Sequence, residues 1–159
     1  MQLLPSPWPS ANLPPPTASL FSVASHKGLV AAAGPDAIIV ATTESLRKAF
    51  ENSGSGDGNF KPFQPQLKLP MPMRISQLAF SADENYLGLS AEDGGGLAVY
   101  EVQALLQGST KSSFELSTSG QALRALTPNP SPDRGELFAA VTVDGSLMMA
   151  NLKERNFLS

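Results

Sequence analysis

The side chains that could do chemistry in this sequence are few, and they lie in short polar segments between apolar runs. His26 is the only histidine and cysteine is absent, so nothing completes a His/Cys metal site or a nucleophile–base pair around it. Asp83–Glu84 and Glu92–Asp93 are carboxylate pairs that could act as acid and base or bind a hard cation. Each pair lies in an expected turn, where Asp is favoured for hydrogen bonding to the local backbone. We therefore expect no catalytic residue, no metal site and no cofactor.

Two further patterns have a plain structural interpretation. The run Gly94–Gly95–Gly96 could suggest a phosphate cradle, but a strand follows it rather than a helix, so it is expected to form a hairpin loop. The methionines at 71, 73, 148 and 149 could mark an adaptable binding surface, although methionine on strands more often fills a core.

Composition narrows the class of protein. The chain has 159 residues, 42% of them hydrophobic and 16% charged, so it is able to bury a core. Its formal net charge is −3 and its eleven Lys and Arg residues form no basic stripe, which argues against direct binding of nucleic acid. No apolar run approaches the roughly 18 residues of a membrane span, and the start is proline-rich rather than a secretory signal, so we expect no membrane insertion.

The elements that must position these side chains repeat along the chain. Three stretches, Leu20–Phe50, Ile75–Leu106 and Ala122 to the C-terminus, share the order strand, turn, strand, Asp-containing turn, apolar strand. The middle copy is the most complete, and its four expected strands are Ile75–Phe80, Tyr86–Ser90, Leu97–Val102 and Ser113–Leu116. The other copies give Leu20–Ala24, Gly28–Ala33 and Ile38–Ala41, then Leu123–Thr127, Leu137–Thr142 and Leu147–Leu152. Four antiparallel strands make one blade of a β-propeller.

The predicted fold class is therefore all-β, a β-propeller fragment of about three four-stranded blades. The third strands are apolar at consecutive positions, as expected when neighbouring blades cover both faces of a sheet. We divide the chain into a Pro-rich extended arm, 1–19, and a partial propeller, 20–159, with blades at roughly 20–70, 74–117 and 121–159. The arm could also be a polyproline ligand. One-turn helices are expected at Glu44–Phe50 and Val102–Leu106, and a flexible Gly/Ser insertion at Glu51–Asn59.

One set of polar residues suggests a partner. The turns between second and third strands open on the same face of every blade, so Asp36, Glu92, Asp93 and Asp144 are expected to lie together there. An acidic rim of this kind can steer a basic protein partner, although turn preference alone also explains these residues.

The middle copy resembles a WD-repeat blade, with Tyr100 where tryptophan is usual and Glu101 where aspartate is usual. A narrower resemblance covers nearly the whole chain. Its segments are Leu4–Ser6, Leu20–Ala24, Lys27–Gly34, Ile38–Val40 and Glu44–Phe50, which are similar to the start of the N-terminal propeller of a fungal cytoplasmic-filament nucleoporin.

That resemblance implies a seven-bladed propeller at the cytoplasmic face of the nuclear pore complex in the nuclear envelope. It implies docking of the DEAD-box ATPase of mRNA export in competition with RNA, and association with other nucleoporins. Seven blades need about twice this length or more, so three blades would leave open faces that favour aggregation. The alternative is a scaffold propeller of another intracellular complex, which further WD-type domains after residue 159 would favour over Phe-Gly repeats. A propeller enzyme would need clustered Asp, Glu and His ligands in the central channel, which these blades do not offer.

Overall fold

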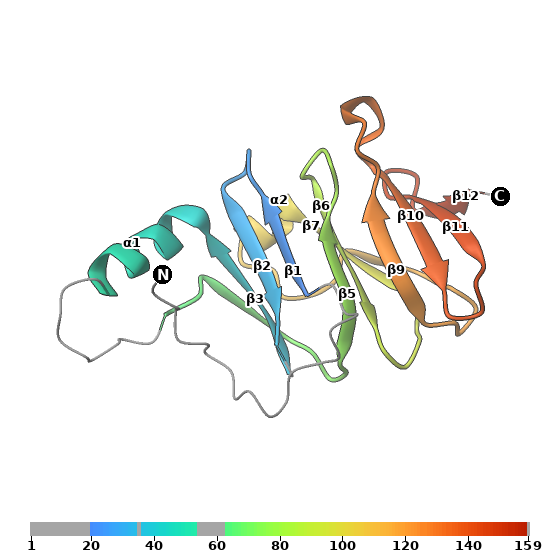
Figure 1. Ribbon diagram of the computed structural model, residues 1–159, viewed down its shortest axis with the longest axis horizontal. Helices are drawn as coiled ribbons and strands as arrows, with labels where there is room; N and C mark the ends of the chain where they lie inside the picture. Colours follow the sequence, from blue (N-terminus) through green and yellow to red (C-terminus); the bar gives the residue numbers. More distant parts are fainter. Residues whose placement is uncertain (1–19, 35, 54–62, 159) are drawn as a thin grey trace.

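The computed structural model describes residues 20–34, 36–53 and 63–158. Within them, twelve strands form three separate four-stranded antiparallel sheets that stand side by side as three propeller blades (Figure 1). Each sheet uses four strands that are consecutive in the chain. The proposed arm, residues 1–19, and most of the predicted insertion at 51–59 lie outside the described residues.

Blade 1 consists of β1 (Phe21–Ala24), β2 (Leu29–Ala33), β3 (Ala37–Thr42) and β4 (Leu67–Pro70). The three predicted strands of this copy are present, and the sequence interpretation had not named β4. The run Ile38–Val40 shows why β3 is apolar at consecutive positions. Ile38 is fully buried and Val40 nearly so on the side of blade 2, while Ile39 is half-buried on the opposite face.

Blade 2 consists of β5 (Ile75–Phe80), β6 (Tyr86–Ala91), β7 (Leu97–Glu101) and β8 (Phe114–Leu116), close to the predicted strands. It is buried on both faces. Along β7, Tyr100 faces blade 1, whereas Leu97 and Val99 face blade 3, because side chains alternate across a strand.

Blade 3 consists of β9 (Leu123–Pro128), β10 (Leu137–Thr142), β11 (Leu147–Asn151) and β12 (Asn156–Leu158). The predicted third strand ended at Leu152, but the chain turns after Asn151 and returns as β12, a three-residue strand that the sequence interpretation had not named. A 3₁₀ turn at Pro132–Arg134 lies in the connection from β9 to β10.

Two helices follow the third strands of blades 1 and 2, as predicted. α2 (Val102–Leu106) has the expected length, but α1 (Thr43–Ser53) is longer than the one-turn helix predicted there. Two ion pairs join residues one turn apart on its exposed side. Lys48 Nζ lies 2.7 Å from Glu44 Oε1, and Arg47 Nε lies 3.8 Å from Glu51 Oε1. The pair between Arg47 and Glu51 crosses the predicted end of the helix at Phe50.

Two apolar cores hold the blades together. The core between blades 1 and 2 centres on Ile38, Leu69, Leu78 and Leu87, and the core between blades 2 and 3 on Leu97, Phe138 and other buried residues. Polar contacts supplement them along the first strands. Ser22 Oγ accepts the amide N–H of Phe80 at 2.9 Å, and Gln77 Nε2 donates to the Arg124 carbonyl at 3.0 Å.

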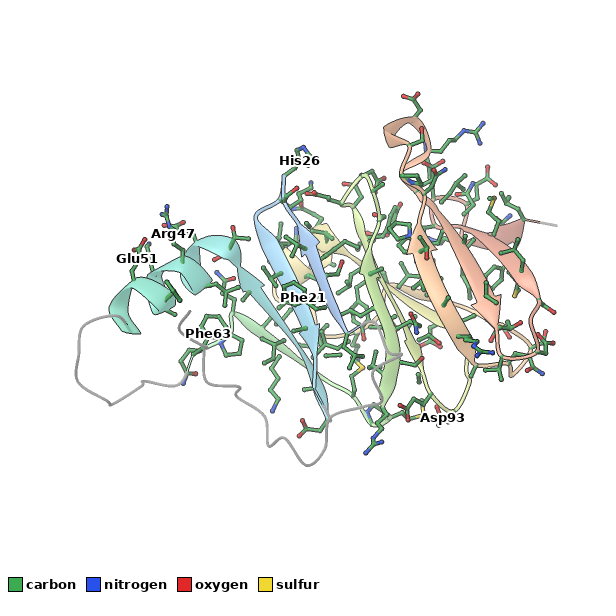
Figure 2. All side chains as sticks on the ribbon, in the orientation of Figure 1. Phe21, His26, Arg47, Glu51, Phe63 and Asp93 are labelled. Atoms are coloured by element: carbon green, nitrogen blue, oxygen red, sulfur yellow. The ribbon has the colours of Figure 1, made fainter. Side chains whose placement is uncertain are left out.

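The outer faces of the terminal blades stay open. On blade 1, Phe21 and Val23 are 62% and 46% exposed (Figure 2 labels Phe21), and on blade 3 Leu147 is 76% exposed. Met149 and its cross-strand partner Leu158 extend the exposed face of blade 3. These side chains alternate with residues that are half-buried or buried, so they have the pattern of a sheet face to be covered.

Candidate partner-binding face

The acidic residues predicted to form a rim lie in equivalent turns. Asp36 precedes β3, Glu92 and Asp93 follow β6, and Asp144 lies between β10 and β11. In Figure 1 the connections β2–β3, β6–β7 and β10–β11 are all at the lower end of the blades, and Figure 2 places Asp93 there. All four residues are exposed. The structure thus brings the three turns that carry these four residues to one end, and the role of the residues in binding a partner stays a prediction.

Asp144 has a local structural task. Its carboxylate accepts hydrogen bonds from the Thr142 hydroxyl and, at 3.1 Å, from the Ser146 amide N–H. These hydrogen bonds, the one from Thr142 first, hold the pKa of Asp144 below its ordinary value. Asp144 therefore stabilises its own turn whether or not it also faces a partner.

Glu92 and Asp93 differ from Asp144 in this respect. Within the described part of the chain, no side-chain hydrogen bond or ion pair engages either carboxylate. The loop that follows them holds the hairpin in place: Gly94, Gly95 and Gly96 all have positive φ angles, from 90° to 108°. A β-carbon on Gly94 would lie 2.7 Å from the Gly120 carbonyl oxygen, and one on Gly96 only 2.2 Å from that of Leu116. The prediction of a hairpin loop rather than a phosphate cradle is consistent with this geometry.

The pair Asp83–Glu84 corrects one sequence interpretation. Asp83 does the expected turn chemistry, since its carboxylate accepts hydrogen bonds from Ser81 Oγ and the Asn85 amide N–H at 2.6 and 3.1 Å. Glu84 does not. It points to blade 1, where its carboxylate accepts the amide N–H groups of His26 at 3.1 Å and Lys27 at 2.7 Å.

The Glu84 carboxylate is therefore an inter-blade clamp. Its side chain is only 10% exposed, and His26 Nδ1 and Ser25 Oγ also lie 3.1 and 3.3 Å from one of its oxygens. Burial opposes ionisation and would raise the pKa of Glu84, but hydrogen bonds from the His26 and Lys27 backbone and from the His26 side chain outweigh it and lower the pKa. His26, at the upper tip of the β1–β2 turn in Figure 2, thus has a structural contact as its visible role.

A shallow groove lies between blades 1 and 2, and the sequence interpretation missed it. Its volume is about 210 Å³, and it is lined by the connection Pro70–Met73, by the glycine loop Gly94–Gly96 and by side chains of β5 to β8. The methionines were expected to fill core, and Met71 does lie partly buried against the core between blades 1 and 2. Met73 and Met149, in contrast, are each 44% exposed.

Among residues 20–34, 36–53 and 63–158, no group of three or more His, Cys, Asp or Glu side chains is placed to hold a metal ion. No helix in these ranges is long and apolar enough to cross a membrane. What the geometry defines is a β-propeller segment whose surface features are turns, a groove and open sheet faces.

Comparison with known proteins identifies which propeller this is. The family described as the NUP159/214 beta propeller matches residues 14–159, and the chain belongs to that family. It is 62% identical over 146 residues to "Nucleoporin NUP159" of Chaetomium thermophilum, an alignment that covers 92% of this chain and 10% of the relative. The chain thus spans about a tenth of that relative's length.

Solved structures support the fold. The N-terminal domain of Nup159 matches with a TM-score of 0.64 at 14% identity, covering 92% of this chain and 34% of that one. Nup159 in a complex of Saccharomyces cerevisiae Dbp5 with Gle1, IP6 and ADP matches with the same TM-score at 12% identity over the same shares. At these identities the likeness speaks for the fold alone. It confirms the predicted β-propeller fragment.

Proposed function

We propose that this chain is part of a nucleoporin docking platform at the cytoplasmic face of the nuclear pore complex, in the nuclear envelope. In this proposal the propeller recruits the DEAD-box ATPase of mRNA export, in competition with RNA, and associates with other nucleoporins. The observation that carries the proposal is the 62% identity to a relative named as the nucleoporin NUP159. The complex in which Nup159 is bound with Dbp5 supports the choice of partner.

The platform is proposed to act by binding rather than by catalysis, with no cofactor. The family is a nucleoporin propeller, and three of the carboxylates described above, Asp83, Glu84 and Asp144, are engaged in turns or between blades. We further propose that the full domain has seven blades. This chain would supply the arm 1–19 and three of those blades, 20–70, 74–117 and 121–159.

The acidic turn face, Asp36, Glu92, Asp93 and Asp144, is proposed to steer the ATPase during association. Glu92 and Asp93 are the best positions for a test, because their carboxylates are exposed and their substitution leaves no hydrogen bond of the turn unmade. Charge reversal of both to lysine should slow association with the ATPase, more at low than at high salt. Steering is largely screened beyond a Debye length, which is about 8–10 Å at physiological salt and longer at low salt. An unchanged association rate would remove the steering role while leaving the docking proposal intact.

Docking itself is tested with the purified export ATPase. Its binding is measured, with and without RNA, to this 159-residue chain and to a longer form that extends through the remaining blades. Binding of the longer form that RNA competes away supports the proposal, and the behaviour of the shorter chain shows whether these blades contribute. If neither folded form binds, the scaffold propeller of another complex becomes the better interpretation.

A further inference from the structure

The groove between blades 1 and 2 has the composition of a peptide-binding site. One wall is the connection Pro70–Met71–Pro72–Met73, and the floor is the face of blade 2 that is turned toward blade 1. That floor is hollow for a reason visible in the sequence. Ala91, Gly96 and Ala98 are small, so this part of blade 2 leaves space where larger side chains would meet blade 1.

Besides Ser112, two polar side chains are set into this apolar lining. Ala98 on β7 is paired in register with Glu115 on β8, which places both side chains on the same face of the sheet, and Tyr100 lies two residues further along that face. Glu115 is the only charged residue among the described residues that line the groove. Its carboxylate contacts Ser112 Oγ at 3.3 Å and, in the described part of the chain, has no ion-pair partner.

Tyr100 supplies the second polar group. Its ring is 5% exposed, and burial, followed by the negative charge of Glu115, raises its pKa. Its hydroxyl makes no hydrogen bond to another described residue, and Tyr100 lines the groove, so this hydroxyl is a candidate donor of a hydrogen bond to a ligand.

The charges around the groove select its occupant. Glu92 and Asp93 directly precede the glycine loop at one end, and Arg74 and Lys111 are the basic residues adjacent to lining segments. Neither basic residue lines the groove, whereas Glu115 does. Residues 1–19 of this chain contain no Lys or Arg, so charge complementarity favours a segment of another protein over the chain's own arm.

We propose that this groove, formed by Met71, Met73, Tyr100 and Glu115, binds a linear segment of a partner protein that carries a large apolar side chain next to a Lys or Arg. The apolar side chain contacts the methionines, and the basic group pairs with the Glu115 carboxylate. Methionine suits such a site because its unbranched side chain adapts to different apolar groups. The inference does not depend on the export ATPase being the partner, and it places a contact on blades 1 and 2.

The methionine methyl groups provide the test. With ¹³C-methyl methionine, the chain is titrated with a short synthetic peptide that has one leucine between lysines in a Gly/Ser background. We expect shifts at Met71 and Met73 and none at Met148, while Met149 reports on the open face of blade 3 as an internal control for non-specific apolar binding.

Matched peptides and variants complete the design. Replacing the lysines of the peptide by glutamate, or its leucine by serine, should weaken binding about tenfold or more, as should Glu115→Lys in the protein. Glu154→Lys, the same charge change at an exposed carboxylate outside the groove lining, should leave the affinity unchanged. The proposal is overturned if Met71 and Met73 do not respond, if Met149 responds alone, or if the glutamate peptide binds as well as the lysine peptide. Failure to bind the export ATPase would not affect any of these outcomes.

Discussion

Removing the charge of the inter-blade clamp should weaken the fold measurably. In Glu84→Gln the side chain keeps its shape, but only its amide oxygen can accept a hydrogen bond, and its NH₂ group faces N–H donors. In the wild type, the Glu84 carboxylate accepts hydrogen bonds from the amide N–H groups of both His26 and Lys27, at 3.1 and 2.7 Å. A hydrogen bond to a charged group contributes about 1.5–3 kcal/mol, and glutamine leaves one of these part-buried donors without its acceptor. We expect a loss of about 2–3 kcal/mol in the free energy of unfolding.

Glutamine is the informative replacement because the backbone at Glu84 is left-handed, with φ of 58°. Glycine would relieve a conformational cost of about 1 kcal/mol and hide part of the effect, whereas glutamine carries the same cost as glutamate. Two controls fit the structure. Glu154→Gln changes an exposed carboxylate that has no partner in the described residues, and His26→Ala removes a side chain that is 91% exposed but leaves both backbone donors paired. Each should cost less than about 0.5 kcal/mol.

The assay is urea unfolding at neutral pH, followed by circular dichroism at low protein concentration. The clamp interpretation fails if Glu84→Gln is no less stable than Glu154→Gln, or if His26→Ala costs as much as Glu84→Gln. The second outcome would mean that the exposed imidazole, rather than the backbone N–H groups of His26 and Lys27, carries the contact.

Three further outcomes follow from the structure. The pKa of Glu84 is lowered in the folded chain, so its contribution to stability is present above the unfolded value of about 4.3 and is lost as the pH falls through the folded pKa. The wild type should therefore lose more stability than Glu84→Gln between about pH 5 and pH 3, which urea titrations at each pH will show. Gly96→Ala should destabilise the chain far more than Gly95→Ala, since both have positive φ but only the β-carbon at Gly96 meets backbone, at 2.2 Å; equal thermal midpoints would contradict this. Leu147→Asp should reduce self-association, measured by light scattering, whereas Gln103→Glu, which adds the same charge at an exposed position on α2, should not. Equal self-association of the two variants would show that the chains do not associate through the open face of blade 3.

The strand pattern of this chain was readable from sequence because apolar runs and turn residues recur in the same order three times. The fourth strands of blades 1 and 3 were not predicted from the sequence, for physical reasons. β4 ends in Pro70 and follows a long insertion, while β12 has only three residues, and neither has an alternation long enough to be recognised. α1 extends past the predicted end at Phe50 to Ser53, and the exposed ion pair between Arg47 and Glu51 crosses that end, although such a pair contributes only about 0.3–0.5 kcal/mol.

The site was less accessible to sequence reasoning. The turns of Asp36, Glu92, Asp93 and Asp144 were placed at one end correctly, because the alternating directions of antiparallel strands fix which turns share an end. Glu84 was assigned to its own turn, yet its partners lie 57 to 59 residues away, and nothing local to the sequence encodes a contact between blades. The groove depends on the small residues Ala91, Gly96 and Ala98 meeting a methionine-bearing connection, which requires the blade arrangement to be known.

Each sheet described above is completed by four strands in uninterrupted chain order. During synthesis, no strand of these blades has to wait for a partner that has not yet left the ribosome. Each blade can form its hydrogen-bonded ladder as it emerges and then serve as the template for the next, because side-chain contacts reach only the adjacent blade. The growing end is always an exposed apolar face, so the rate of translation sets how long that face stays open to other chains.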